Sequence, residues 1–117
     1  MPMENSKENI IVNKVVEFSL FIIEYIEELE RRKKFVIANQ LLKSGTSIGA
    51  NVCEAQNAES KIDFTHKFKI AAKEIEETRY WLILCDRANN YPDCKYLSEK
   101  LFEIEKIITK IISSSKK

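Results

Sequence analysis

The stretch LLKSGTSIGANVCEA, residues 41–55, decides between two very different folds. It holds both glycines of the 117-residue chain, together with two serines, a threonine and an asparagine. Such residues suit either a loop that binds phosphate or a helix that admits a close neighbour. A P-loop needs G-x-x-x-x-G followed by Lys and by Ser or Thr. Gly45 and Gly49 lie too close together for that motif, and no lysine follows them. The sequence therefore argues against a phosphate-binding loop.

The glycines instead share a helical stripe with apolar residues. Steps of three and four residues alternate along it, as expected for one face of a helix. The stripe consists of Phe35, Ala38, Leu42, Gly45, Gly49 and Val52, flanked by Leu41, Ile48 and Ala55. An interior glycine costs roughly 1 kcal/mol relative to alanine. We therefore expect close helix packing at Gly45 and Gly49, against Trp81, Tyr80 or the aromatic residues of the first helix.

Comparable patterns divide the whole chain into four helices. The expected helices cover about residues 7–32, 35–58, 60–89 and 92–113. Ser60 and Asp63 match a helix start motif, and Pro92 is expected in the first turn of the last helix. Short connections favour antiparallel neighbours. The sequence predicts an all-α fold, a single domain over residues 1–117 built as an antiparallel up-down-up-down four-helix bundle.

The first helix has a wider apolar face than a small bundle requires. A main line of apolar residues, spaced as a heptad seam, runs along it. A second line lies one residue later, which corresponds to a rotation of about 100°. This second line consists of Val12, Val16, Ile23 and Ile26. We expect it to contact either another helix of the bundle or a second subunit.

Composition restricts the classes of partner. The net charge is +1 and the pI is about 7.7, so nucleic-acid binding would need a local basic patch. Three widely spaced cysteines predict reduced thiols in a cytoplasmic protein. The polar start resembles no signal peptide. Charged residues interrupt the apolar run of residues 10–26, so we expect no membrane association.

Few residues suit catalysis or metal binding. The one histidine, His66, pairs with Asp63 as a single D-x-x-H, whereas ferritin-like sites need a pair of E-x-x-H motifs. Cys53 and Cys85 fall on or near apolar seams, where a nucleophile is of little use. Glu74 and Glu77 lie on one face of the third expected helix. Such a pair is more typical of a solvated face than of a metal site. We expect a non-enzymatic protein without cofactor or metal.

One basic cluster stands out, at the expected turn between the first two helices. It comprises Arg31, Arg32, Lys33 and Lys34, with Lys43 further along the chain. A symmetric assembly would repeat this candidate nucleic-acid site as a charged rim that holds phosphates by counterion release. The alternative is a solvated turn whose cations complement the helix dipole. No aromatic residue interleaves the cluster, so the sequence does not predict base stacking.

A polar stripe marks another face of the second helix. It consists of Ser44, Ser47, Asn51 and Glu54, at spacings of three and four residues. The stripe is either solvated or a polar contact between subunits. For the second interpretation, the candidate interface residues are Ser47, Asn51, Glu54 and Trp81.

The segment SGTSIGANVCEAQNAES, followed by DFTHKFKIAAKEIEETRYWL, closely resembles a bacterial four-helix-bundle family. That family is named for intervening sequences in 23S ribosomal RNA genes. The match is strongest over residues 35–84, and the outer helices agree in length and pattern. The resemblance implies a ring-like homopentamer without established catalytic activity. It also relates the chain to accessory proteins of diversity-generating retroelements, basic barrels that bind nucleic acid and a reverse transcriptase.

These expectations leave three functional hypotheses. The leading one is a cytoplasmic, self-assembling accessory protein that binds RNA or DNA, alone or in a ribonucleoprotein. The alternative is a protein-interaction scaffold whose partner is encoded nearby. The third is a passenger product of a mobile insertion.

Overall fold

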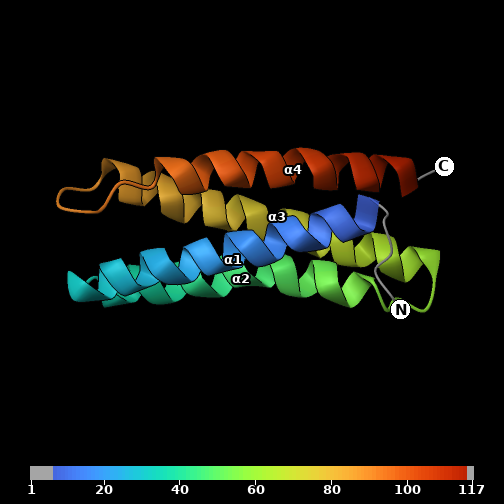
Figure 1. Cartoon of the computed structure of the whole chain (residues 1–117), viewed down its shortest axis with the longest axis horizontal. Coiled ribbons are helices and arrows are strands. Elements are labelled where there is room, and N and C mark those ends of the chain that lie inside the picture. The colour runs from blue at the N-terminus through green and yellow to red at the C-terminus, as the bar shows by residue number, and fades with distance from the viewer. Residues whose placement is uncertain (1–6, 116–117) are drawn as a thin grey trace.

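The computed structural model describes residues 7–115, and these residues form four α-helices and no strand. The all-α prediction is therefore confirmed. The helices lie side by side in an elongated molecule of 46 × 23 × 20 Å (Figure 1). They are α1 (Lys7–Arg31), α2 (Phe35–Ala55), α3 (Lys61–Arg87) and α4 (Lys95–Ser115).

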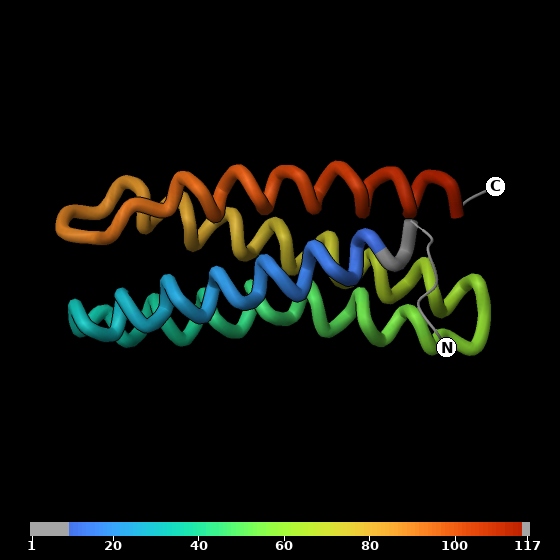
Figure 2. The backbone as a smooth tube through the Cα atoms, in the orientation of Figure 1, coloured from blue at the N-terminus to red at the C-terminus, as the bar shows by residue number. Residues whose placement is uncertain are grey.

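Each helix packs beside its neighbours in the chain, and α4 also packs against α1, while the backbones of the diagonal pairs stay farther apart. Contacts between α1 and α2 run in opposite order along the two helices, because Gly45 faces Ile22 and Gly49 faces Val15. The chain trace reverses at each connection (Figure 2). The connection that follows α1 and the connection that follows α3 therefore lie at the same end of the molecule.

Local hydrogen bonds explain where the later helices begin. Ser60 Oγ accepts a 3.0 Å bond from the Asp63 amide, which is the cap that the sequence motif predicts. The prediction for Pro92 was wrong, because α4 begins only at Lys95. The Pro92 carbonyl instead accepts a 2.7 Å bond from the Tyr25 hydroxyl. This bond holds the connection against the end of α1 before the last helix starts.

The nearest neighbours of the two α2 glycines belong to α1. A Cβ built on Gly45 would lie 3.1 Å from side-chain carbons of Ile22. A Cβ on Gly49 would lie 3.3 Å from Ser19 Oγ and 3.4 Å from Val15 Cβ. The expected aromatic partners were therefore wrong. The glycines meet Val15, Ser19 and Ile22 of α1, and their bare backbone lets the two helices approach closely.

Two positions of the α2 pattern differ from the sequence interpretation. Phe35, the first residue of α2, is 54% exposed. Ser44 is buried and bonded to Thr78, so it does not belong to the polar stripe. The core of α2 is built from Ala38, Leu41, Ile48, Val52 and Ala55.

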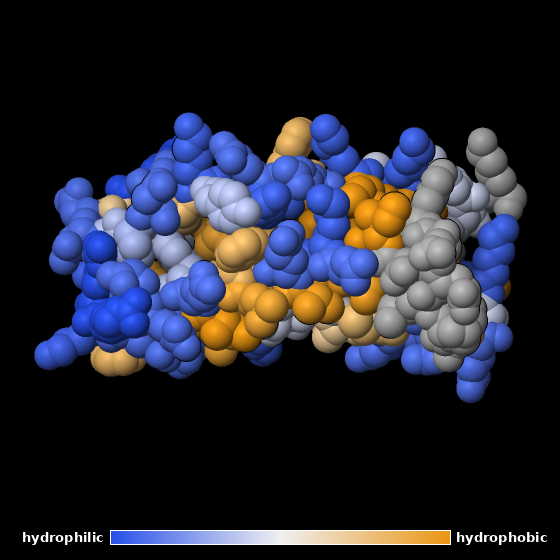
Figure 3. All heavy atoms as spheres, in the orientation of Figure 1, coloured by the Kyte–Doolittle hydropathy of each residue, from blue (hydrophilic) through white to orange (hydrophobic). Residues whose placement is uncertain are grey.

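The second apolar line of α1 divides between core and surface. Val12 and Ile26 are buried. Val16, Leu20 and Ile23 are 48%, 58% and 41% exposed, and we call these three residues the α1 stripe. Figure 3 shows hydrophobic surface along the middle of the face that carries α1. Within the bundle itself, this strip of apolar surface has no cover.

None of the helices in the described part of the chain is long and apolar enough to cross a membrane.

Candidate nucleic-acid interface at the end of the bundle

The basic cluster occupies a tight helix-ending turn. The Lys34 amide donates a 2.9 Å bond to the Leu29 carbonyl, and the Lys33 amide donates one to the Glu30 carbonyl. These two bonds form a Schellman motif, which requires a left-handed residue at its centre. Lys33 occupies that position with φ of 61°. The turn therefore projects four consecutive basic residues from a rigid backbone.

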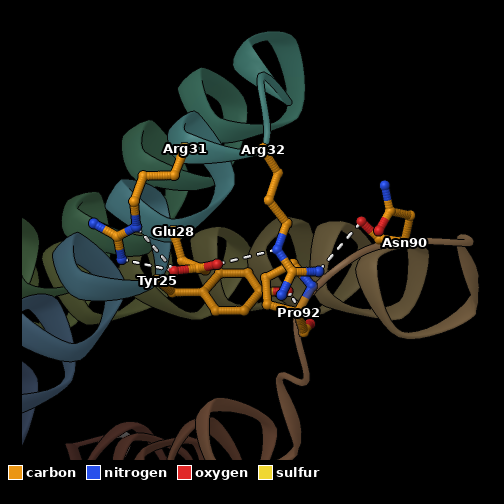
Figure 4. Close-up of polar contacts among 6 residues, drawn as sticks. All are labelled: Tyr25, Glu28, Arg31, Arg32, Asn90 and Pro92. Carbon is orange, nitrogen blue, oxygen red and sulfur yellow. Dashed lines mark hydrogen bonds and ion pairs between the residues drawn. The ribbon is translucent and has the colours of Figure 1, made fainter.

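One carboxylate neutralises part of the cluster. Glu28 accepts bonds of 2.7 and 3.0 Å from Arg31 and a bond of 3.0 Å from Arg32 (Figure 4). Hydrogen bonds from the two guanidinium groups hold the pKa of Glu28 below its usual range. Both ion pairs are exposed, so they are weak. The arginines remain able to exchange Glu28 for another anion.

The connection between α3 and α4 completes the same surface. Arg32 Nη1 donates to the Asn90 carbonyl at 3.4 Å, across 58 positions of sequence (Figure 4). Lys34 Nζ lies 5.0 Å from the centre of the Tyr91 ring, a cation–π geometry. No aromatic residue interleaves residues 31–34 in the sequence, and Tyr91 joins the cluster from a distant connection. Only the fold brings Tyr91 there, and no local sequence signal could have identified it. We call residues 31–34 together with residues 87–91 the basic end.

A shallow hollow of about 410 Å³ opens beside the Tyr91 ring. Its lining consists of Ile37, Leu84, Arg87, Ala88 and Tyr91. The floor is apolar, the lining includes one cation, and no carboxylate belongs to it. The basic end therefore combines positive charge with an aromatic surface.

Lys43 does not join the cluster. It lies nine residues beyond Lys34 on α2, or about 13 Å along the helix axis. Its surroundings are acidic: burial and the nearby Glu77 raise the pKa of Glu74, and the positive charge of Lys43 opposes that rise. The structure thus assigns Lys43 to the face between α2 and α3.

The candidate subunit-interface residues lie on that same face, and each has a partner within the chain. Asn51 Nδ2 donates to the Ser47 carbonyl at 2.9 Å. Glu54 accepts from Lys67 of α3 at 2.9 Å. Trp81 Nε1 donates to Glu77 at 3.1 Å. Their role in a subunit contact stays a prediction. The α1 stripe, on a different face, is the more apolar surface.

The remaining reactive groups are dispersed or buried. Burial raises the pKa of the Cys85 thiol, and it raises that of Cys94 to about 11. Both thiols are therefore protonated at neutral pH. His66 is exposed on α3. Among the side chains that the structure describes, no three from His, Cys, Asp or Glu gather in a geometry that could hold a metal ion.

The helices and the basic end together define an all-α four-helix protein with a charged, aromatic-containing end. The chain belongs to the 23S rRNA-intervening sequence protein family, whose model matches residues 7–110. It is similar to a crystal structure from Bacteroides thetaiotaomicron, a protein of unknown function from the S23 ribosomal protein family. The two chains are 40% identical with a TM-score of 0.86, and the match covers 92% of this chain and 99% of that one. No curated protein matches the sequence.

Proposed function

We propose that this chain is a cytoplasmic, non-enzymatic accessory protein that assembles into a ring-like homopentamer and binds RNA or DNA through the basic end. The observation that carries the proposal is the basic end itself. There, four consecutive cations on a rigid turn meet an aromatic ring from another connection. The protonated state of the buried thiols supports a non-catalytic role. The family name, which refers to ribosomal RNA genes, is consistent with a nucleic-acid partner.

The α1 stripe supports self-assembly. Leu20 is 58% exposed between two further apolar residues, and covering such a strip removes apolar surface from water at about 25 cal/mol per Å². In a ring, this face of one copy would contact a different face of the next copy. Each added copy would contribute another basic end. Repetition would turn a weakly charged patch into a rim that holds several phosphates.

The assembly is tested by light scattering coupled to size-exclusion chromatography. Leu20→Glu is expected to reduce the oligomer to smaller species, because a charge in a covered apolar contact is costly. Ile62→Glu is the matched control, since Ile62 is 83% exposed on another helix. A wild-type monomer at micromolar concentration, or equal effects of both variants, would contradict assembly through the α1 stripe.

Nucleic-acid binding is tested by fluorescence anisotropy with RNA and DNA at several salt concentrations. Replacing Arg31, Arg32, Lys33 and Lys34 with alanine is expected to weaken binding and flatten the salt dependence. The control replaces four exposed lysines elsewhere and removes the same charge: Lys69, Lys73, Lys106 and Lys110. A salt slope near zero for the wild type would refute the electrostatic interface.

Glu28→Gln is the variant that should strengthen nucleic-acid binding in the same experiment. The neutral amide no longer competes with phosphate for Arg31 and Arg32. We expect tighter binding and a salt slope that steepens by about 0.7 to 0.9 for each additional phosphate contact. Unchanged binding would mean that neither arginine touches the nucleic acid.

A protein-interaction scaffold is the second candidate function, and the exposed α1 stripe favours it. An apolar contact with a protein encoded nearby would tolerate high salt. Under this alternative, Leu20→Glu abolishes capture of that partner, whereas the four alanine substitutions in the basic turn leave it intact. A wild-type oligomer that does not bind nucleic acid at low salt would favour the scaffold function.

A further inference from the structure

We infer that the hollow beside Tyr91 receives one unpaired nucleobase, so that the basic end prefers single strands over duplexes. This inference rests on the proposed nucleic-acid function and specifies its ligand. The two ideas can fail separately, because charge governs binding to any nucleic acid while the hollow concerns only a base that is free of its partner strand.

The surface of the hollow suits a flat aromatic ligand. Ile37, Leu84 and Ala88 supply apolar floor from α2 and α3, and the Tyr91 ring forms part of the wall. Leu84 is 36% exposed although it is a large apolar residue. A nucleobase would cover this surface and could stack on the ring. The volume of about 410 Å³ falls within the range typical of small-ligand sites.

Charge complementarity selects a nucleotide over a neutral aromatic group. Arg87 belongs to the lining, and Lys34 Nζ stands 5.0 Å from the Tyr91 ring centre. Both cations can reach the phosphates on either side of a bound base. A larger groove between α3 and α4, of about 460 Å³, is lined by two carboxylates and three cations: Asp86, Asp93, Arg79, Arg87 and Lys95. The hollow at Tyr91 has Arg87 and no carboxylate in its lining, so no negative charge within it opposes a phosphate backbone.

The connection that carries Tyr91 is held in place before any ligand arrives. The Tyr25 hydroxyl binds the Pro92 carbonyl at 2.7 Å, and Arg32 binds the Asn90 carbonyl. Asn90 has φ of 66°, a conformation that asparagine tolerates better than most residues. The ring is therefore flanked by fixed backbone, which lowers the entropy lost when a ligand stacks on it.

The preference for single strands follows from the chemistry of stacking. A duplex hides the faces of its bases in the helical stack, whereas a single strand can turn one base outward. Every base has a π face, so a stacking site of this kind discriminates little between sequences. The basic end is expected to bind single-stranded RNA or DNA without strong sequence preference.

The experiment compares one oligonucleotide as a single strand and as a duplex in the presence of wild-type and variant protein. Tyr91→Leu keeps apolar volume but removes the ring, and Tyr91→Phe keeps the ring. We expect Tyr91→Leu to weaken single-strand binding by roughly 5-fold to 100-fold. Duplex binding should change less than about two-fold, and Tyr91→Phe should behave as wild type. Phe102→Leu is the matched control, because Lys106 lies 5.1 Å from that exposed ring in the same kind of pair.

A second measurement locates the base directly. A single strand that carries 5-iodouracil, irradiated in complex with the wild-type protein, should crosslink to Tyr91. Equal losses for Tyr91→Leu and Phe102→Leu, or equal losses on single strand and duplex, would overturn the inference. Unchanged single-strand binding by Tyr91→Leu would also overturn it. The hollow would then be assigned to an apolar side chain of a partner protein. If the wild type binds neither form of nucleic acid, the proposed function fails as well.

Discussion

The hydroxyl of Thr78 donates a 2.9 Å hydrogen bond to the hydroxyl oxygen of Ser44, inside the contact between α2 and α3. Among the described residues, these two are the only buried polar residues. Each hydroxyl is the hydrogen-bond partner of the other, and a buried polar group requires such a partner. The bond therefore fixes one position of α2 along α3.

This pair predicts that the double substitution costs less stability than the single one. Ser44→Ala leaves the Thr78 hydroxyl without its partner and should lower the free energy of unfolding by about 1 to 3 kcal/mol. The double variant Ser44→Ala with Thr78→Val removes both polar groups and should recover most of that loss. Urea denaturation at one fixed protein concentration measures both. Simple additivity of the two single effects would contradict the pairing.

The two glycines of α2 predict unequal responses to alanine. At Gly49 the added Cβ meets the rotatable Ser19 hydroxyl at 3.3 Å, so the gain in helix propensity of about 0.8 to 1 kcal/mol should survive. At Gly45 the Cβ meets several carbons of Ile22 at 3.1 to 3.3 Å, and overpacking of about 1 to 3 kcal/mol should outweigh that gain.

Thermal or urea unfolding of both alanine variants measures this order. Gly49→Leu extends the comparison, because a large side chain at that site must separate α1 from α2 and should destabilise the fold. If Gly45→Ala proved as stable as Gly49→Ala, or if Gly49→Leu folded with wild-type stability, the close contact would not be a constraint.

The left-handed residue at the end of α1 predicts a stabilising substitution. Lys33 has φ of 61°, which disfavours any residue with a Cβ by about 1 to 2 kcal/mol. Lys33→Gly relieves this strain, while the greater freedom of glycine in the unfolded chain offsets part of the gain. We expect a net increase of about 0.5 to 1 kcal/mol in unfolding free energy. Lys33→Ala, which removes the charged side chain but keeps the Cβ, should change stability by less than about 0.5 kcal/mol and serves as the control.

The buried thiols and phenol predict a loss of stability in alkali. Burial, with the nearby thiols, raises the pKa of Tyr25, and burial raises that of Cys94 from 9.0 to about 11. Because the folded state holds these protons more tightly, the stabilisation is complete below pH 9. It is lost as pH rises, since the unfolded chain ionises first.

For Cys94 the loss between pH 9 and 11 should be about 2 kcal/mol. Urea unfolding of the wild type and of Cys94→Ala across this range measures it, and the variant should show a shallower decline. Cys53→Ala, at an exposed cysteine, should keep the wild-type slope. Identical slopes for all three proteins would show that Cys94 does not contribute.

Sequence reasoning predicted the four helices because periodicity is a local property of the chain. A residue that recurs every three or four positions lies on one face of a helix whatever surrounds it. The same logic put Gly45 and Gly49 on the packed side of α2, and the local motif formed with Asp63 identified Ser60 as a helix cap. Phe35 and Pro92 were misplaced because both lie at helix ends, where packing and hydrogen bonds from other elements decide the conformation.

The contents of the candidate site came from the tertiary structure. The sequence showed the run from Arg31 to Lys34, but not that Glu28 would share its carboxylate with two of those arginines. It could not show Tyr91 beside Lys34, because that contact depends on which ends of the helices meet. Helical periodicity by itself determined which side of each helix is buried. Close packing between segments that are distant in the sequence decides which side of one helix meets which side of another. Only the folded chain brings those segments together.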